Sequence, residues 1–410
     1  MAAKKSGRKG RCRYKYVINN YGRFGGKLDK DTKKSVLKAA STVVCLTSYS
    51  GDKQMFICSG FIMESCDNGC GTFTGTILTS AILLRSPSGA DDLKIDVYMA
   101  GGAFFKGQLL AVDFHYNIAI ITINSNAPLP TSTVRLIDKS VPLDPGNRGC
   151  FEDLNLSHFA GHQDSAISSN RFSLYPGTAV LALGRYFADS YDIMAAPGEF
   201  SYGDCKFDCK ELLISSCKIK KNGMGGPLIN SLGEVIGVNF YKASYTPFLP
   251  MNIVCQCYRD LKTQCRIPRP WIGLSVVDLF GGSLHELEIL NQKFPQVVEG
   301  AIVKQALPNS PACIADLRAG DVIINCDGNL VRSCLELTEA LWDKEGKPVE
   351  LVVVRESADK PLSLVVEAVK TNPNTYRWPV PERRVVNNHP LLRERFIWSS
   401  NSLFPWPALL

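Results

Sequence analysis

Short runs of β-branched and other apolar residues, separated by Gly, Asp, Asn and Pro, dominate the chain between residues 42 and 240. Such runs are typical of strands, and their repeated spacing predicts an all-β barrel or sandwich. A short helix is expected just before them, over Thr32–Ala40. The expected strands are Thr42–Ser48, Phe56–Met63, Gly75–Leu78, Ile95–Met99, Phe104–Val112, Ile118–Ile123, Thr178–Leu183 and Val235–Phe240.

The pattern changes after Cys265, where Arg266-Ile-Pro-Arg-Pro270 has the composition of a linker. Strands and helices alternate over the next stretch of about 100 residues, which is enough for a complete small α/β module. Its expected elements are the strand Ile272–Val276, the strand Gly300–Val303, the helix Pro311–Leu317, the strand Gly320–Asn325, the helix Ser333–Leu341 and the strand Val349–Arg355.

Composition refines this division of the 410 residues. With 45% hydrophobic and 21% charged residues, the chain is globular rather than fibrous or wholly disordered. No run approaches the roughly 18–20 apolar residues of a membrane span, so none is expected. The expected domains are a basic flexible tail (1–34), a β domain (35–265), the α/β module (266–370) and a tail rich in Pro, Trp and Arg (371–410).

The net charge of +7 comes from the first tail, since residues 1–34 sum to +10 and the rest to −3. The body is therefore not a basic, nucleic-acid-binding type of domain. The cluster within residues 4–15 is of the kind that contacts polyanions or directs nuclear import. Intracellular, nuclear or nucleocytoplasmic localisation is favoured; a chloroplast or mitochondrial transit peptide and a solvated tail without an address are the alternatives.

The cysteine count of 15 is odd and the residues are scattered, which fits reduced thiols in an intracellular protein. None of the three close pairs has the CxxC spacing of a zinc site. The sequence therefore predicts no metal and no cofactor. The pairs are Cys66/Cys70, Cys205/Cys209 and Cys255/Cys257.

The most informative motif is Asn222-Gly-Met-Gly-Gly-Pro-Leu228, followed by Gly233-Glu-Val-Ile-Gly-Val-Asn239. It resembles the nucleophile loop and the next strand of the HtrA/Do-like (Deg) family of trypsin-like serine proteases. A tight glycine-rich turn there presents the nucleophile and aims backbone N–H groups at the developing oxyanion. The resemblance implies a mostly β fold, a trypsin-like double β-barrel followed by a PDZ-like α/β domain.

The likeness extends over residues 35–370. Leu78–Ala81 resembles the strand end that carries the general base, and Val112–Ala119 resembles the segment that carries the orienting acid. Phe248-Leu-Pro250 stands where the family closes its primary specificity pocket. Trp271-Ile-Gly-Leu274 is similar to a piece of the family's PDZ domain, and the single-PDZ layout resembles the plant Do-like branch.

All three catalytic positions implied by the resemblance are replaced. Met224 stands at the nucleophile, Ile82 at the general base and Asn117 at the orienting acid. A thioether has no proton to lose, and isoleucine cannot titrate. Triad residues act as a unit, so their loss leaves only about 10³–10⁴-fold acceleration over water. The sequence thus predicts a catalytically inactive protein, a pseudoprotease.

Two residues outside these positions are candidates for rescued activity. Cys217, seven residues before Met224, is a possible displaced nucleophile. His115 would share a strand face with Asn117 if the strand were regular, and is expected at the surface or in a loop. The oxyanion loop either keeps a hole able to bind a carbonyl or carboxylate, or keeps its glycines only because the barrel needs the turn. This loop comprises Asn222, Gly223, Met224 and Gly225.

The PDZ resemblance implies that an extended peptide C-terminus adds as a strand, with a glycine-containing loop holding its carboxylate. An external peptide is the main expectation, and self-occupancy by the apolar end Phe404–Leu410 is the alternative. The expected groove residues are Ile272, Gly273 and Leu274 in the loop, Ser275 and Val276 in the strand, and Leu337 and Leu341 on the facing helix.

The sequence thus predicts a pseudoprotease that binds peptide C-termini or unfolded protein segments, in a scaffold, chaperone-like or regulatory role. One alternative is an active serine-type endopeptidase with a non-standard nucleophile. Another is a nuclear or nucleic-acid-associated adaptor acting through the basic tail. The resemblance also implies a homotrimer, assembled here through aromatic residues of the first tail, namely Tyr14, Tyr16, Tyr21 and Phe24.

Overall fold

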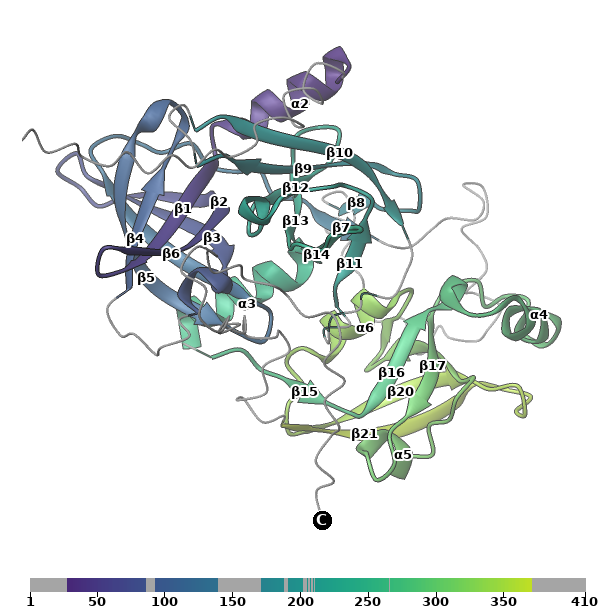
Figure 1. The fold of residues 1–410 in the computed structure, drawn as a ribbon. Coiled ribbons are helices and arrows are strands. Elements are labelled where there is room, and N and C mark those ends of the chain that lie inside the picture. Colours follow the sequence, from purple (N-terminus) through teal and green to yellow (C-terminus); the bar gives the residue numbers. More distant parts are fainter. Residues whose placement is uncertain are drawn as a thin grey trace, which may run out of the picture.

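The computed structural model describes residues 28–85, 93–138, 171–187, 191–201, 205, 207, 209, 211–264 and 266–370. Two closed six-stranded barrels are followed by a seven-stranded sheet (Figure 1). The expected fold class is confirmed, because these are a trypsin-like pair of barrels and a PDZ-like sheet. The expectations for residues 1–27 and for the tail 371–410 lie outside the described residues.

The first barrel closes in the order β1-β2-β3-β6-β5-β4. All of its pairings are antiparallel, and bulges at Ser48/Tyr49 and Leu109/Ala111 help the sheet to curl into a barrel. Its interior is filled by aliphatic side chains of alternating strand positions. The strands are β1 (Val43–Ser50), β2 (Lys53–Asp67), β3 (Phe73–Ser80), β4 (Leu93–Tyr98), β5 (Phe104–Asp113) and β6 (Ile118–Ser125).

The second barrel closes in the order β10-β11-β14-β13-β12-β9. The helix α2 (Lys30–Ala40) precedes the first barrel, with Asp29 as its N-cap. Two short strands, β7 (Leu136–Asp138) and β8 (Arg171–Ser173), pair in parallel beside the second barrel. The barrel strands are β9 (Ala179–Arg185), β10 (Ile193–Ser201), β11 (Leu213–Ser215), β12 (Pro227–Ile229), β13 (Val235–Asn239) and β14 (Thr246–Pro250).

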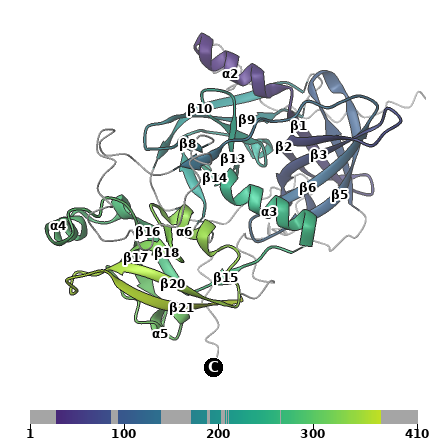
Figure 2. The same ribbon diagram turned by 180° about the vertical axis from the view of Figure 1, so that it is seen from behind.

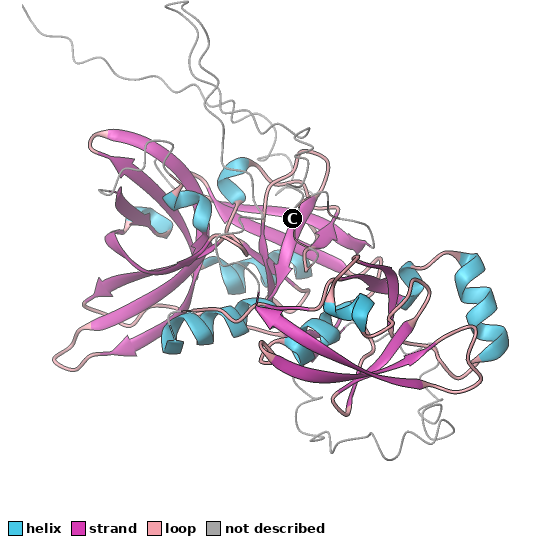
Figure 3. Cartoon of the chain, turned by 90° about the horizontal axis from the view of Figure 1, so that it is seen from below, coloured by secondary structure: helices cyan, strands magenta, loops and turns pink. Residues whose placement is uncertain are grey.

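The PDZ-like sheet has the order β15-β21-β20-β18-β17-β16, with β19 paired to β18. Figure 3, coloured by secondary structure, shows this sheet and its helices as a body beside the barrels. The strands are β15 (Pro270–Trp271), β16 (Leu274–Asp278), β17 (Ala301–Ala306), β18 (Val322–Cys326), β19 (Asn329–Leu330), β20 (Lys347–Val354) and β21 (Leu362–Lys370). The helices are α4 (Leu284–Lys293), α5 (Pro311–Ile314) and α6 (Cys334–Leu341).

The helix α3 (Met251–Gln264) links the second barrel to the PDZ-like sheet and was not predicted from the sequence. In Figures 1 and 2, α6 lies between the barrels and this sheet. The barrel cluster of buried apolar residues includes Leu335 and Trp342 of the PDZ-like part. The two parts therefore share a packed, partly apolar contact.

Most predicted elements begin or end a few residues from their expected bounds, and for two elements of the PDZ-like part the backbone gives a local reason. The strand expected over Ile272–Val276 begins at Leu274, because Gly273 has a left-handed backbone with φ 79°. The helix expected over Pro311–Leu317 ends at Ile314, and Asp316 with φ 63° breaks it two residues later. No helix of the described residues is long and apolar enough to cross a membrane.

Candidate functional site

The residue expected at the general-base position, Ile82, lies in the 3₁₀ turn η1 (Ala81–Leu84) that follows β3. The Ser80 hydroxyl caps this turn by accepting a hydrogen bond from the Ile82 N–H at 3.3 Å. Only 1% of Ile82 is exposed, and its side chain belongs to the apolar cluster of the first barrel. A buried aliphatic group here can pack but cannot carry a proton.

Met224, expected at the nucleophile position, follows the 3₁₀ turn η6 (Lys221–Gly223) of the second barrel. It is 7% exposed and lies in the same apolar cluster as Ile82, in the core of the first barrel. Its carbonyl accepts a hydrogen bond from the Ser59 N–H at 2.8 Å. The structure therefore places the two residues expected at the nucleophile and base positions in one apolar cluster.

Asn117, expected at the orienting-acid position, lies in the turn between β5 and β6 with φ 56°. It is 3% exposed, and its backbone carbonyl accepts from the Ala81 N–H at 3.0 Å. Within the described residues, no donor lies within hydrogen-bond distance of the Asn117 Oδ1. A buried amide oxygen without a donor is costly, and an imidazole N–H at position 82 is the kind of group that would satisfy it.

His115 was expected at the surface or in a loop, and it does lie in a turn, but it is buried. His115 is 7% exposed rather than at the surface, and it packs edge-on against Tyr116 at 4.8 Å between ring centroids. It also lies in the turn after β5, so it does not share a strand face with Asn117. The reason is tertiary, since Tyr116 in turn stacks on Trp342 of the PDZ-like part, which covers this turn.

The oxyanion loop is closed by its own hydrogen bonds. The Met224 N–H donates to the Lys221 carbonyl at 3.2 Å, and the Gly223 N–H donates to the Lys220 carbonyl at 2.9 Å. The Asn222 carbonyl accepts from the Ser59 hydroxyl at 2.6 Å. A donor of an oxyanion hole must point to the reacting oxygen, and here the Met224 N–H is engaged within the turn.

The turn needs glycine at position 225 for steric reasons, whether or not the loop has a catalytic role. Its φ is 77°, and an added Cβ would lie 2.5 Å from both the Ser59 carbonyl oxygen and the Ser80 nitrogen. Its N–H donates to the Asn239 carbonyl at 2.8 Å, which joins the loop to β13. The close approach of three backbone segments is a sufficient structural reason for this glycine.

Cys217 has the properties of a core thiol. It has no exposed surface, and its Sγ lies 3.7 Å from the Val180 carbonyl oxygen. Burial raises the pKa of the Cys217 thiol above its usual value of 9.0. Because the thiolate is the nucleophilic form, this environment disfavours attack by Cys217.

Phe248, expected at the closure of the specificity pocket, is completely buried in β14. Its ring packs edge-on against Phe200 at 6.4 Å, and a Cβ on Gly237 would come within 2.5 Å of it. A large aromatic ring therefore occupies the space beneath β13 in the second barrel.

The loop expected to hold a peptide carboxylate is shaped by the segment 307–312. The Gly273 carbonyl accepts from the Leu307 N–H at 2.9 Å, and the Ile272 carbonyl accepts from the Ala312 N–H at 2.9 Å. A Cβ on Gly273 would lie 2.2 Å from the Ser310 Cβ, so only glycine fits. Both carbonyls are thus turned toward segment 307–312, and Ile272 is buried in the module core.

The strand after this loop is an edge strand of the PDZ-like sheet. Among the described residues, β16 pairs with β17 only, with Ser275 opposite Gln305 and Val276 opposite Val303. A free edge of this kind is what a peptide needs for strand addition. The helix α6, which was expected to form the facing wall, contacts β16, with Leu337 buried in the module core and Leu341 half-buried.

One contact between β16 and α6 was not predicted from the sequence. The Asp278 carboxylate at the end of β16 accepts from the Cys334 N–H at 2.7 Å, at the start of α6. Ser59, which joins the two barrels through the Asn222 carbonyl, was also missed. Neither has a local signal, because the partners are 56 and 163 residues away along the chain. In the part of the chain that the structure describes, no cluster of three or more His, Cys, Asp or Glu could hold a metal.

Comparison with protein families agrees with this architecture. Residues 58–238 match the trypsin-like peptidase domain, and residues 270–366 match the PDZ domain. The chain is 29% identical over 320 residues to "Putative protease Do-like 14" of Arabidopsis thaliana, which covers 75% of this chain and 65% of that protein. It is 26% identical over 325 residues to "Serine protease HTRA1" of Xenopus tropicalis, covering 76% and 60% respectively.

The chain spans 60% to 65% of the length of these two relatives. Among solved structures, the HtrA-type protease AlgW with a tripeptide superposes with a TM-score of 0.52 at 19% identity, covering 83% of this chain and 98% of that chain. This similarity concerns the fold.

Proposed function

Because this chain belongs to the HtrA/Do-like family of trypsin-fold proteins with a PDZ domain, we propose that it is a pseudoprotease that binds peptides. The observation that carries the proposal is the shared burial of Ile82 and Met224 in one apolar cluster. Where catalysis needs a base beside a nucleophile, these two side chains only pack. Asn117, with its unsatisfied Oδ1, supports the same interpretation.

The proposed ligand is an extended peptide segment with an apolar C-terminus, or an exposed segment of an unfolded protein. Its support is the free edge of β16 beside the left-handed Gly273 and the apolar wall of α6. The AlgW structure of the same fold holds a tripeptide. The barrel cleft, whose oxyanion loop is closed, is the secondary site of this proposal.

The test is hydrolysis of casein and of labelled peptides by the wild type, beside the triple variant Ile82→His, Asn117→Asp and Met224→Ser. The wild type should be inert, because the three positions supply neither base nor nucleophile. Cleavage by the triple variant would show that the loop can open when the chemistry is returned. Hydrolysis by the repurified wild type would refute the proposal.

Active endopeptidase chemistry with another nucleophile is the competing function. Cys217 is its named candidate, and the burial of that thiol argues against it. If the wild type does cleave, Cys217→Ser in the same assay decides whether this residue is responsible.

We also propose the domain boundaries 35–265 and 266–370, and a polyanion contact through residues 4–15. The tail proposal predicts that deletion of residues 1–34 abolishes salt-sensitive retention on heparin, since phosphate-like contacts weaken with salt. Unchanged retention would place the contact elsewhere. Assembly as a homotrimer is a proposal of the same kind, which light scattering of the full chain would test against a Tyr/Phe-to-Ala tail variant.

A further inference from the structure

The helix α6 (Cys334–Leu341) presents apolar residues on two different faces. Cys334, Leu337 and Leu341 are spaced three and four residues apart and pack in the core of the PDZ-like module. Leu335 and Trp342, seven residues apart on another face, belong to the barrel cluster. One short helix therefore forms a wall of the peptide groove and, on its other side, part of the contact with the barrels.

The apolar part of this contact centres on Trp342. Its ring stacks on Tyr116 of the first barrel, with centroids 6.0 Å apart and an interplanar angle of 22°. Its indole N–H donates to the buried Asp260 carboxylate of α3 at 2.7 Å. These contacts fix the C-terminal end of α6 to the first barrel and to α3.

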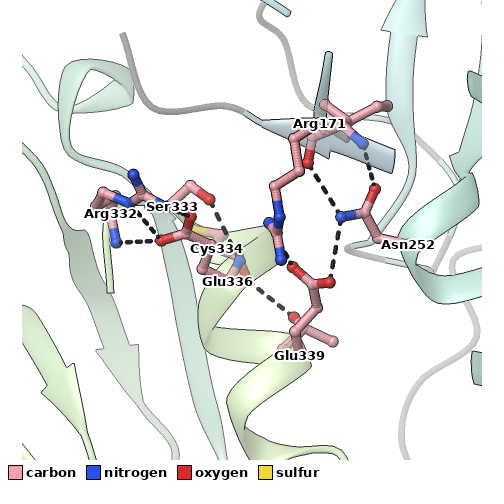
Figure 4. Close-up of polar contacts among 9 residues, drawn as sticks. Arg171, Asn252, Arg332, Ser333, Cys334, Glu336 and Glu339 are labelled. Atoms are coloured by element: carbon pink, nitrogen blue, oxygen red, sulfur yellow. Dashed lines mark hydrogen bonds and ion pairs between the residues drawn. The ribbon is translucent and has the colours of Figure 1, made fainter. Parts of the chain in front are cut away.

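The polar part, which we call the seam, centres on Glu339 (Figure 4). Asn252 of α3 donates to the Glu339 Oε1 at 3.2 Å, and Arg171 of β8 lies 3.5 Å from the Glu339 Oε2. Asn252 is held in place by Ile137, whose N–H and C=O both bond to its amide. Glu339 thus faces the barrels from the middle of α6.

A second set of charges extends the seam toward the start of α6. Arg332 pairs with Glu336 at 2.7 Å. Glu299 is half-buried and interacts electrostatically with Arg332 and Glu336. From the barrel side, the charge of Asp138 in β7 also acts on it. The described seam therefore holds four carboxylates but two guanidinium groups: Asp138, Glu299, Glu336 and Glu339 against Arg171 and Arg332.

We infer that α6 couples the peptide groove to the barrels through a latch that tightens when the acid-rich seam takes up protons. The pH dependence of docking concerns the seam alone. Only the effect of docking on the peptide groove rests on the proposed function. On the groove side, the link is the Asp278 carboxylate, which holds the Cys334 N–H and so ties β16 to α6.

The direction of the pH dependence of docking follows from two seam carboxyl groups whose pKa is raised, those of Glu299 and Glu339. Burial raises the pKa of Glu299 from 4.5 to about 7. The charge of Arg332 opposes this increase, and the charges of Glu336 and Asp138 add to it. Burial also raises the pKa of Glu339. Arg171 and the hydrogen bond from Asn252 lower this pKa, whereas the charge of Glu336 raises it further. A group with a raised pKa in the docked state stabilises docking at low pH. This stabilisation is lost as the pH rises from 4.5 through about 7.

The first experiment is hydrogen–deuterium exchange of residues 333–342 in the full chain without peptide, between about pH 5.5 and 8. After correction for intrinsic exchange, opening of α6 should increase roughly tenfold toward pH 8, allowing for the partial exposure of Glu299. The strand β20 of the same module serves as the internal reference. Equal pH dependence in α6 and β20 would overturn the latch.

Variants distinguish titration of the seam carboxyl groups from an effect of low pH on the whole protein. The double variant Glu299→Gln and Glu339→Gln keeps the shapes but removes both titrating groups, so α6 should stay protected at every pH. Glu288→Gln on the exposed side of α4 is the matched control and should behave as the wild type. Asn252→Asp adds a carboxylate beside Glu339 and should increase opening at pH 7. A double variant with the wild-type pH dependence would refute the inference.

The second experiment tests the effect on the groove. A fluorescein-labelled hexapeptide with three apolar C-terminal residues and a free carboxylate is titrated by anisotropy, beside its C-terminal amide. The wild type should bind it about threefold more tightly at pH 5.5 than at pH 8, because a fixed wall lowers the ordering cost. The double variant should lose this difference.

The outcomes of the two experiments are distinguishable. If α6 exchange titrates but the hexapeptide affinity does not, the coupling to the groove is wrong. If no affinity for the hexapeptide is found at any pH, the proposed function fails while the exchange data still decide on the latch.

Discussion

At the scale of residues, Ile82 and Met224 are core side chains, 1% and 7% exposed. Both are buried in one aliphatic cluster that also holds Leu83 and Leu46 of the first barrel. In the structure they contribute packing to the apolar cluster of the first barrel. A side chain that fills a site in this way should matter for stability rather than for turnover.

Replacement of Met224 by alanine tests this. Truncating a buried methionine leaves a cavity, and we expect a loss of about 2–4 kcal/mol in the free energy of unfolding, measured by urea denaturation. Leu232→Ala is the control, because Leu232 is 59% exposed and should cost less than about 1 kcal/mol. Equal effects of the two variants would contradict the packing role of Met224.

Glu286 offers a prediction with a definite pH dependence. Hydrogen bonds from Lys304, at 2.6 Å, and from the Ser283 N–H lower the pKa of Glu286 from 4.5 to about 2. A lowered pKa stabilises the fold above pH 4.5, and this stabilisation is lost as the pH falls toward 2. Glu286→Gln should therefore lower the melting temperature modestly at pH 7, and the difference should shrink toward pH 2.5. A constant difference would assign the effect to the capping geometry alone.

At the scale of elements, the loop before β16 depends on Gly273. Its φ of 79° and the 2.2 Å approach to Ser310 leave no room for a side chain. Gly273→Ala should therefore displace the loop and reduce affinity for an apolar C-terminal peptide at least tenfold. Gly281→Ala is the control, because its Cβ would meet Val277 at an ordinary 3.5 Å. Comparable affinities for the two variants would argue against this loop as the carboxylate site.

The strands of the first barrel were predictable, because β-branched runs between turn residues define them locally. The boundaries were less so: β2 runs over Lys53–Asp67, well beyond Phe56–Met63, because its ends pair within long hairpins. The helix α3 was missed because Ile253 and Val254 favour strands by propensity. Burial of the residues of α3 against the second barrel overrides that local preference.

At the scale of the whole molecule, the linker is attached to both of its neighbours. Arg269 forms an ion pair with the buried Asp113 of β5, and its N–H donates to Glu345 just beyond α6 at 3.0 Å. Arg266 also pairs with Glu345, but its side chain is 54% exposed. The linker thus belongs to the contact between the barrels and the PDZ-like module.

Arg269→Ala should leave the Asp113 carboxylate buried with much less compensation and cost about 3 kcal/mol in stability. Arg266→Ala, an exposed pair in the same linker, should cost below about 1 kcal/mol. Thermal unfolding measures both variants, and small-angle scattering should show a more extended shape for Arg269→Ala only. Identical behaviour of the two variants would mean that the linker contact does not hold the parts together.

Some features of the candidate site were predictable from local sequence, and others depend on residues far away along the chain. The motif around Met224 and the loop around Gly273 were visible in the sequence, because turns impose residue types locally. The burial of His115 was not, since its ring packs on Tyr116, which in turn stacks on Trp342, far away along the chain. The closure of the oxyanion loop depends on which backbone carbonyl each N–H meets, and residue types alone do not determine this.

The burial of Ile82 and Met224 in one apolar cluster also has a consequence for attempts to build catalysis into this chain. The single substitution Ile82→His would bury an imidazole among aliphatic side chains without a nucleophile to serve. The single substitution Met224→Ser would open a cavity and leave a hydroxyl without a base. Each step lowers stability and none alone restores turnover, because triad residues act as a unit. If the proposed function holds, protease activity could therefore be built into this chain only through single variants that are less stable and still inactive.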